Sequence, residues 1–292
     1  MVNDKQAVLK TLKYSDLFDF PQTKEEIKKF LVKKVENRKL KKILSSSSEI
    51  FFDSGYYCLK GREKVINIRK KREEESLLKI EKAKKVSFFL SKIPSIMLLG
   101  ISGSVAAKNA KKEDDIDLFI VTYKNTLWIS RLLMILFLKV LGMYRSKGKK
   151  DVENKFCLNM YLTEESMGFK KNKRNLYTAR EICQLIPLFQ RENSYSKFIT
   201  KNNWIKKYLP NANIFLKKED KKLTNNGKSV FGQKFLSLFE IPARNLQIRK
   251  ISKNLTKETV SHNFIAFHPK DVMNLIINRY NKYPGVFTTR GY

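Results

Sequence analysis

Residues 95–122 constrain the fold of this chain more than any other segment. They begin with SIMLLGIS at 95–102, an uninterrupted apolar run that is typical of a strand buried on both faces. Gly103-Ser104 then predicts a tight turn that opens a short helix, and DIDLFIVT at 115–122 predicts a second buried strand. Two apolar strands joined through a turn and a helix predict an α/β domain with a mixed sheet and flanking helices.

A third strand, KFCLNMYLT at 155–163, extends this pattern after a long apolar helix. Period-2 alternation divides the side chains of the third strand between two faces. One predicted face carries Phe156, Leu158, Met160 and Leu162, and the other carries Cys157, Asn159 and Tyr161. The helix before it includes LWISRLLMILFLKVLGM at 127–143, which we interpret as buried in the protein. It has only 17 residues, two of them charged, whereas a membrane span needs about 20 apolar residues.

Residues 1–66 predict a winged helix-turn-helix-like module. The module begins with three stretches of helical spacing, and a capping box of Thr23 and Glu26 opens the second. Two short aromatic strands follow, joined by a turn at Asp-Ser-Gly. Either nucleic-acid contact through the third helix or a purely protein-binding role fits this order. The basic residues near the third helix are Lys33, Lys34, Arg38, Lys39, Lys41 and Lys42.

Three further parts follow the module. Residues 67–92 lack Gly and Pro and predict a linker helix, residues 93–168 hold the α/β domain, and residues 169–292 predict an all-helical C-terminal domain. The net charge is +32, and the C-terminal part carries 25 Lys and Arg against 7 Asp and Glu. Such an excess favours an anionic partner such as RNA or DNA. The alternative is a basic surface that is merely solvated.

The compartment is predicted from the cysteines and the N-terminus. Three widely spaced cysteines give no disulfide framework, and the polar first residues carry no secretory signal, so we expect a cytoplasmic protein without membrane association. Only two histidines, His262 and His268, are available, which leaves little room for a zinc site.

The acidic residues Asp115 and Asp117 are the main candidates for chemistry. Carboxylates at i and i+2 on a strand point to the same side, where they can share a divalent cation. The Gly103-Ser104 turn would present backbone N–H groups and a hydroxyl to phosphates, and Lys108 adds positive charge nearby.

The run LLGISGSVAAKNAKKEDDIDLFIVT resembles the signature of the polymerase-β-like nucleotidyltransferase superfamily, in which a strand ends in Gly-Ser and the next carries acid–apolar–acid. Ten residues separate Gly103-Ser104 from Asp115-Ile116-Asp117 here. The resemblance implies a nucleotidyltransferase fold and transfer of a nucleoside monophosphate from a nucleoside triphosphate to a hydroxyl of RNA, a protein or a small molecule. Asp115 and Asp117 would hold Mg²⁺, or Mn²⁺ in its place, and Gly103, Ser104 and Lys108 would bind the phosphates.

The family usually has a third carboxylate on a later strand, and this sequence has Asn159 where we expect it. An amide cannot act as a base, and the nearby acids Asp151, Glu153 and Glu164 are the substitutes. One alternative is therefore a catalytically degenerate protein that binds nucleotide or nucleic acid and regulates through the winged helix. Another is a nucleotidyltransferase-like partner in a toxin–antitoxin pair.

Overall fold

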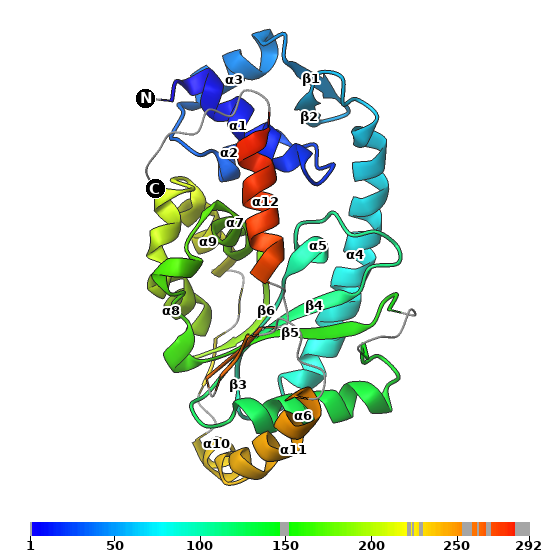
Figure 1. Ribbon diagram of the computed structural model, residues 1–292, viewed down its shortest axis with the longest axis vertical. Coiled ribbons are helices and arrows are strands. Elements are labelled where there is room, and N and C mark those ends of the chain that lie inside the picture. Colours follow the sequence, from blue (N-terminus) through cyan, green and yellow to red (C-terminus); the bar gives the residue numbers. More distant parts are fainter. Residues whose placement is uncertain are drawn as a thin grey trace.

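The computed structural model places a mixed sheet at the centre of the molecule, with helices on both faces (Figure 1). This confirms the predicted α/β class, while the nucleotidyltransferase and winged-helix assignments stay predictions. The residues that the structure describes are 2–146, 152–220, 223, 225–227, 230–252, 259–261, 263–266 and 270–283.

The strands of the sheet follow the order β7-β6-β3-β4-β5-β9-β8. The pairs β4–β5 and β6–β7 are parallel, and the other neighbours are antiparallel. The apolar segments identified in the sequence form the three central strands. The bounds are β3 (Ile96–Ile101), β4 (Ile116–Thr122), β5 (Phe156–Thr163), β6 (Ile186–Arg191), β7 (Asn225–Asn226), β8 (Thr259–Val260) and β9 (Phe264–Ala266).

Each face of the sheet has its own hydrophobic core. One core lies under α6 (Leu127–Val140) and α11 (Glu240–Ser252), next to α10 (Val230–Ser237), at the bottom of Figure 1. The carboxylate of Glu240 accepts the backbone N–H groups of Trp128 and Ile129 at 3.0 Å and so caps α6 from the neighbouring helix. The other core lies against α7 (Leu176–Gln184), α8 (Ser194–Lys201), α9 (Ala212–Asp220) and α12 (Lys270–Lys282).

The N-terminal residues form three helices and then a hairpin, in the predicted order. The Thr23 hydroxyl accepts the Glu26 N–H at 3.2 Å and the Glu26 carboxylate accepts the Thr23 N–H at 2.9 Å, so the capping box is confirmed. The hairpin turns at Ser54 and Gly55, which both have positive φ (49° and 86°). The bounds are α1 (Asp4–Asp16), α2 (Lys24–Phe30), α3 (Asn37–Ser46), β1 (Ile50–Asp53) and β2 (Tyr56–Leu59).

The predicted basic surface of this module lies on α3 and just before it. Arg38, Lys39, Lys41 and Lys42 are exposed on α3. Lys33 precedes the helix and pairs with Asp4 at 2.8 Å. Nucleic-acid contact through this helix stays a prediction.

Helix α4 (Val65–Leu90) connects the N-terminal module to the sheet and runs along one side of the molecule (Figure 1). It starts close to the start of the predicted linker helix, but it does not merely link two separate parts of the chain. Ile80, Ala83 and Val86 are buried in the core shared with α6. The helix is therefore part of the packed α/β body.

The prediction of an all-helical C-terminal domain is wrong. Residues after 168 supply β6, which pairs with β3, and β9, which pairs with β5. Residues 176–189 have helical spacing, but the helix ends at Gln184, because Pro187 has no N–H to donate within a helix and disfavours helical geometry in the residue before it. Residues 230–252 form two helices separated at Leu238–Phe239, and Pro242 lies in the first turn of α11, where its missing N–H costs nothing.

Among the described residues, no helix has both the length and the apolar character that a membrane crossing requires. Helix α6, which holds most of the apolar run of residues 127–143, has 14 residues.

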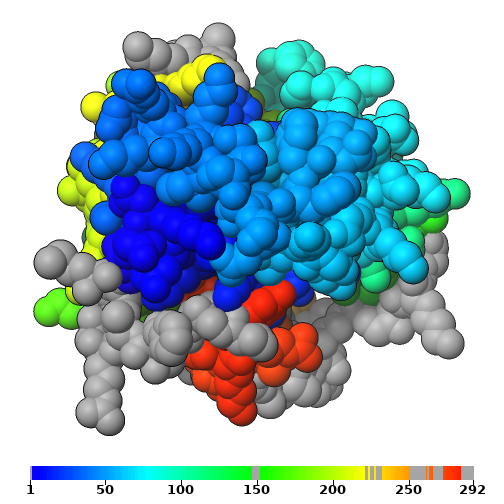
Figure 2. Space-filling model, turned by 90° about the horizontal axis from the view of Figure 1, so that it is seen from above, coloured from blue at the N-terminus to red at the C-terminus, as the bar shows by residue number. Residues whose placement is uncertain are grey.

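The N-terminal module docks on α7 through Arg180. Its buried guanidinium donates to the Ser15 hydroxyl at 2.9 Å and to the Thr11 carbonyl at 3.3 Å. It also lies 4.3 Å from the ring centre of Tyr14 and 4.5 Å from that of Phe30. Burial lowers the pKa of Arg180 to about 10, so the side chain is still charged at neutral pH. Figure 2 shows the module (blue) covering this end of the molecule, with α12 (red) beside it.

We expect Arg180→Met to lower the free energy of unfolding by about 2–3 kcal/mol, because buried acceptors of the module lose their donor. Urea unfolding followed by circular dichroism measures the loss. Arg38→Met on the exposed face of α3 removes the same charge and should change the free energy by less than about 0.5 kcal/mol. Equal values for the two variants would contradict this account of the docking.

Candidate active site

Strand β4 presents its two carboxylates on one face of the sheet. Ile116 and Leu118 pack in the core beneath α6, so their neighbours in sequence face the opposite side. Asp115, just before the strand, and Asp117, within it, therefore lie on the same face, as the i and i+2 spacing predicts.

The Gly103 turn lies directly against Asp117. The Ser102 N–H donates to the Asp117 carbonyl at 2.9 Å, which holds the end of β3 against β4. Gly103 has φ +67°, and a Cβ atom at this position would lie 2.5 Å from Asp117 Oδ2. Only glycine combines this backbone geometry with so close an approach.

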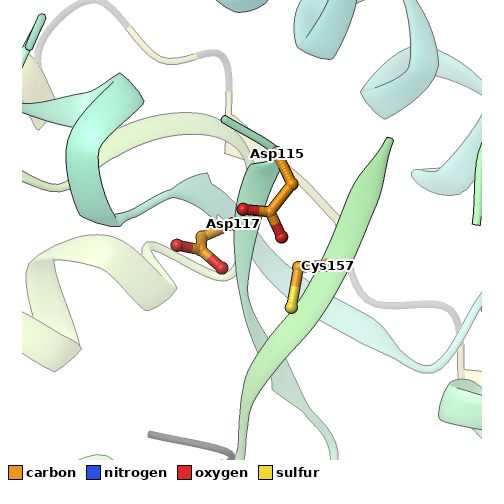
Figure 3. A group of neighbouring side chains, drawn as sticks. All are labelled: Asp115, Asp117 and Cys157. Atoms are coloured by element: carbon orange, nitrogen blue, oxygen red, sulfur yellow. The ribbon is translucent and has the colours of Figure 1, made fainter. Parts of the chain in front are cut away.

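Cys157 completes the group. The parallel register of β4 and β5 pairs Asp117 with Cys157. One carboxylate oxygen each of Asp115 and Asp117 and the Cys157 sulfur lie within 4.8 Å of one another. Figure 3 shows these three side chains, two from β4 and one from β5, gathered in one space. All three cysteines of the chain are free thiols.

Arg145 is the nearest cation in the part of the chain that the structure describes. Its Nη1 donates to Asp115 Oδ2 at 2.7 Å and to the Cys157 sulfur at 3.5 Å. The Arg145 side chain is 41% exposed, against 16% for that of Asp115. The guanidinium thus covers the carboxylate of Asp115, the outer of the two, from the solvent side.

The electrostatics of the inner carboxylate are unusual. Burial, and then the negative charge of Asp115, raise the pKa of Asp117 to about 7 from an ordinary value of 3.8. Burial and the two carboxylates also raise the pKa of the Cys157 thiol, which is therefore protonated at neutral pH. The positive charge that the protein itself places near Asp117 does not fully compensate the negative charge of the ionised carboxylate.

The side chains predicted to bind phosphate have partners within the protein. The Ser104 hydroxyl donates to Asp114 Oδ2 at 3.0 Å. Lys108 Nζ lies 3.5 Å from Glu73 Oε1 on α4. Helix α5 (Gly103–Ala106) is a single turn. A phosphate-binding role for Gly103, Ser104 and Lys108 stays a prediction.

Asn159 is not a member of the acidic group. The β4–β5 register shifts so that Leu118 pairs with Leu158 and Phe119 with Met160, which leaves Asn159 in a bulge, where it is buried. The predicted alternation along β5 is therefore wrong beyond Leu158, because an inserted residue exchanges the faces that follow. Cys157, rather than Asn159, stands beside the carboxylates.

Two of the three predicted substitutes for a third acid also lie elsewhere. Glu153 lies in the loop before β5, and Glu164 follows the far end of that strand, where it accepts the Lys124 N–H at 3.1 Å. Asp151 lies outside the described residues, as do His262 and His268.

The structure adds a carboxyl group that the sequence did not single out, Glu181 on α7. It lines a cavity of about 740 Å³ that also reaches Ser102, next to the Gly103 turn. Its charge contributes to raising the pKa of Asp117, and burial raises its own pKa to about 7. The available signal was an acidic residue directly before the largely apolar stretch of residues 182–186.

The donor set fits one hard divalent cation. Mg²⁺ is commonly bound through one or two carboxylates together with phosphate oxygens and water, and Asp115 and Asp117 supply the carboxylates. The protonated Cys157 sulfur is a poor ligand for such an ion. A cation here would supply the positive charge that ionised Asp117 lacks.

Comparisons with protein-family models, with curated proteins and with solved structures gave no match to this chain.

Gly103→Ala should lower the free energy of unfolding by about 2–4 kcal/mol, since the new methyl group would add a clash with Asp117 to the strain of positive φ. Gly61→Ala is the matched control, because Gly61 has φ +88° and nothing within 4 Å of the added Cβ. Its loss should be about 1 kcal/mol, from strain alone. Chemical denaturation measures both losses. If Gly103→Ala lowers the free energy of unfolding no more when Asp117 is present than in an Asp117→Ala background, the clash is refuted.

Asp117→Asn should stabilise the metal-free protein at pH 8 and have little effect at pH 4. The raised pKa means that the folded state binds a proton more tightly than the unfolded state, so the stability contributed by this group is lost as pH rises from about 4 to 7. We expect a gain on the order of 2 kcal/mol at pH 8. Urea unfolding in EDTA across this pH range tests it, with Asp53→Asn on the hairpin as the control. A gain in the free energy of unfolding that does not change with pH would exclude the raised pKa of Asp117 as its cause.

Proposed function

We propose that this protein transfers a nucleoside monophosphate from a nucleoside triphosphate to an acceptor hydroxyl and releases pyrophosphate. One observation carries the proposal: two carboxylates of one strand face a glycine turn that approaches the inner carboxylate too closely for any side chain. This arrangement places the backbone of a turn directly beside two carboxylates, which suits a metal-bound triphosphate.

Asp115 and Asp117 would hold Mg²⁺, or Mn²⁺ in its place. When bound, the ion supplies positive charge that offsets the charge of the triphosphate and of the departing pyrophosphate. The carboxylates fix its position, and the protonated Cys157 thiol lies beside them.

The remaining residues of the site bind and orient the triphosphate. Gly103 lets phosphate oxygens approach the backbone of the turn, with Ser104 and Lys108 beside it. Arg145 is half exposed beside Asp115, and its guanidinium can exchange this carboxylate for phosphate oxygens once a cation occupies the site.

The acceptor class is a separate question. The net charge of +32 favours an anionic partner such as RNA or DNA on the outer basic surface, but it does not identify the acceptor. The third-carboxylate position is instead taken by a thiol, which favours the second candidate, a degenerate protein that binds nucleotide and regulates without turnover.

Incubation with each α-³²P-labelled nucleoside triphosphate and Mg²⁺, with RNA, protein and small-molecule fractions of a cell lysate as acceptors, separates these candidates. We expect transfer of label by the wild type and a loss of at least about 100-fold in Asp115→Asn and Asp117→Asn, because both remove metal-binding charge. Asp53→Asn should retain full activity. Nucleotide binding without any transfer would instead establish the degenerate binding protein.

A further inference from the structure

A cavity of about 740 Å³ lies between the sheet and helices α7 and α12. Ser102 connects it to the Gly103 turn, and Phe119 and Met160 form its floor on the sheet. Tyr177 on α7 and Met273 on α12 line the opposite wall. The volume lies within the range of sites that enclose small molecules, about 300–1,000 Å³.

The charges of the cavity do not favour a polyanion. Lys170 and Lys173 are balanced by Glu165 and Glu181, and most of the other lining residues are apolar or aromatic. Grooves that bind nucleic acid carry a continuous excess of positive charge. The lining therefore suits a compact, largely apolar molecule more than an RNA or DNA strand.

Glu181 is the carboxyl group of the cavity nearest to the acidic group. Helix α7 packs against α5, the turn that begins at Gly103, so that Glu181 acts electrostatically on Asp117. No hydrogen-bond donor contacts its carboxylate within the described part of the chain, whereas Glu165 is held by Lys124 at 2.7 Å. A half-buried carboxyl group that lines a cavity and has no partner among the described residues is available to a bound ligand.

We propose that this cavity binds the acceptor, a small molecule with a hydroxyl group on a largely apolar or aromatic body, and that Glu181 accepts the proton of that hydroxyl. The inference rests on the nucleotidyl transfer proposed above and specifies its acceptor and its base. The acceptor oxygen forms a bond to the α-phosphorus while the bond from this phosphorus to the β-phosphate oxygen breaks. The proton passes to Glu181, and the electron pair leaves with pyrophosphate.

The protonation behaviour of Glu181 agrees with this role. Burial raises its pKa to about 7, where a carboxylate is a stronger base and is still substantially ionised at neutral pH. Asp117 on β4, Tyr14 on α1 and Tyr177 on α7 are the titratable groups close enough to interact with it. Because Asp117 titrates in the same range, a pH profile alone cannot identify the base, and the test uses substitutions.

The experiment first finds which lysate fraction receives label from α-³²P-labelled nucleotide, and then measures turnover on the labelled compound. We expect label in the small-molecule filtrate. Glu181→Gln should lower kcat by at least about 100-fold while its affinity for nucleotide with Mg²⁺, measured by equilibrium dialysis, stays within twofold. Glu74→Gln, the same change on the exposed face of α4, is the control, and a melting temperature at or above that of the wild type shows that Glu181→Gln is folded.

A second variant tests the cavity independently. Asn172→Trp places a large ring on its exposed rim and should raise KM for the acceptor at least fivefold without weakening nucleotide binding. Weaker nucleotide binding would show that the cavity holds the nucleoside, which overturns the assignment.

The remaining outcomes separate the two proposals. Transfer that requires Asp115 and Asp117 but survives Glu181→Gln, or that labels RNA or protein, overturns this inference and leaves the proposed function standing. No transfer to any fraction overturns both.

Discussion

The buried guanidinium of Arg69 fixes the position of the candidate site relative to the rest of the protein. It pairs with Glu26 of α2 at 2.9 Å and with Glu73 of α4 at 3.4 Å, and it donates to the carbonyls of Ala107 and Lys108 behind the Gly103 turn. A charge removed from water is tolerated only when its partners are all in place. The turn against Asp117 is therefore held from behind by the N-terminal module, through a residue far from it in sequence.

The central strands and the acidic pair followed directly from the sequence, because they depend on short-range patterns. Apolar runs predicted β3 and β4, and the i and i+2 spacing placed Asp115 and Asp117 on one face. The prediction that Asn159 lies beside the two carboxylates was wrong, for a physical reason. A bulge arises from the pairing of two strands, so the alternation of β5 alone could not show that Asn159 is the extra residue and that Cys157 stands beside Asp117.

The C-terminal residues show a second limit of local patterns. The stretch of 176–189 has helical spacing throughout, yet its second half pairs with β3, because the edge of the sheet offers unpaired backbone groups that a strand can satisfy. Glu181 was missed for the same reason. Its position near the Gly103 turn depends on the packing of α7 against α5, and the sequence pattern of the helix does not reveal this packing.

The topology of the sheet has a consequence for how the chain reaches its native state. Strands β6 and β9, which flank the three central strands, both come from residues after 168. When only the first part of the chain has left the ribosome, β3 and β5 are open edges with unpaired backbone groups, and such edges promote aggregation. The α/β body is thus completed only after β6 and β9 have been synthesised, and a fragment ending near residue 168 would be a poor choice for expressing the part that carries the acidic group.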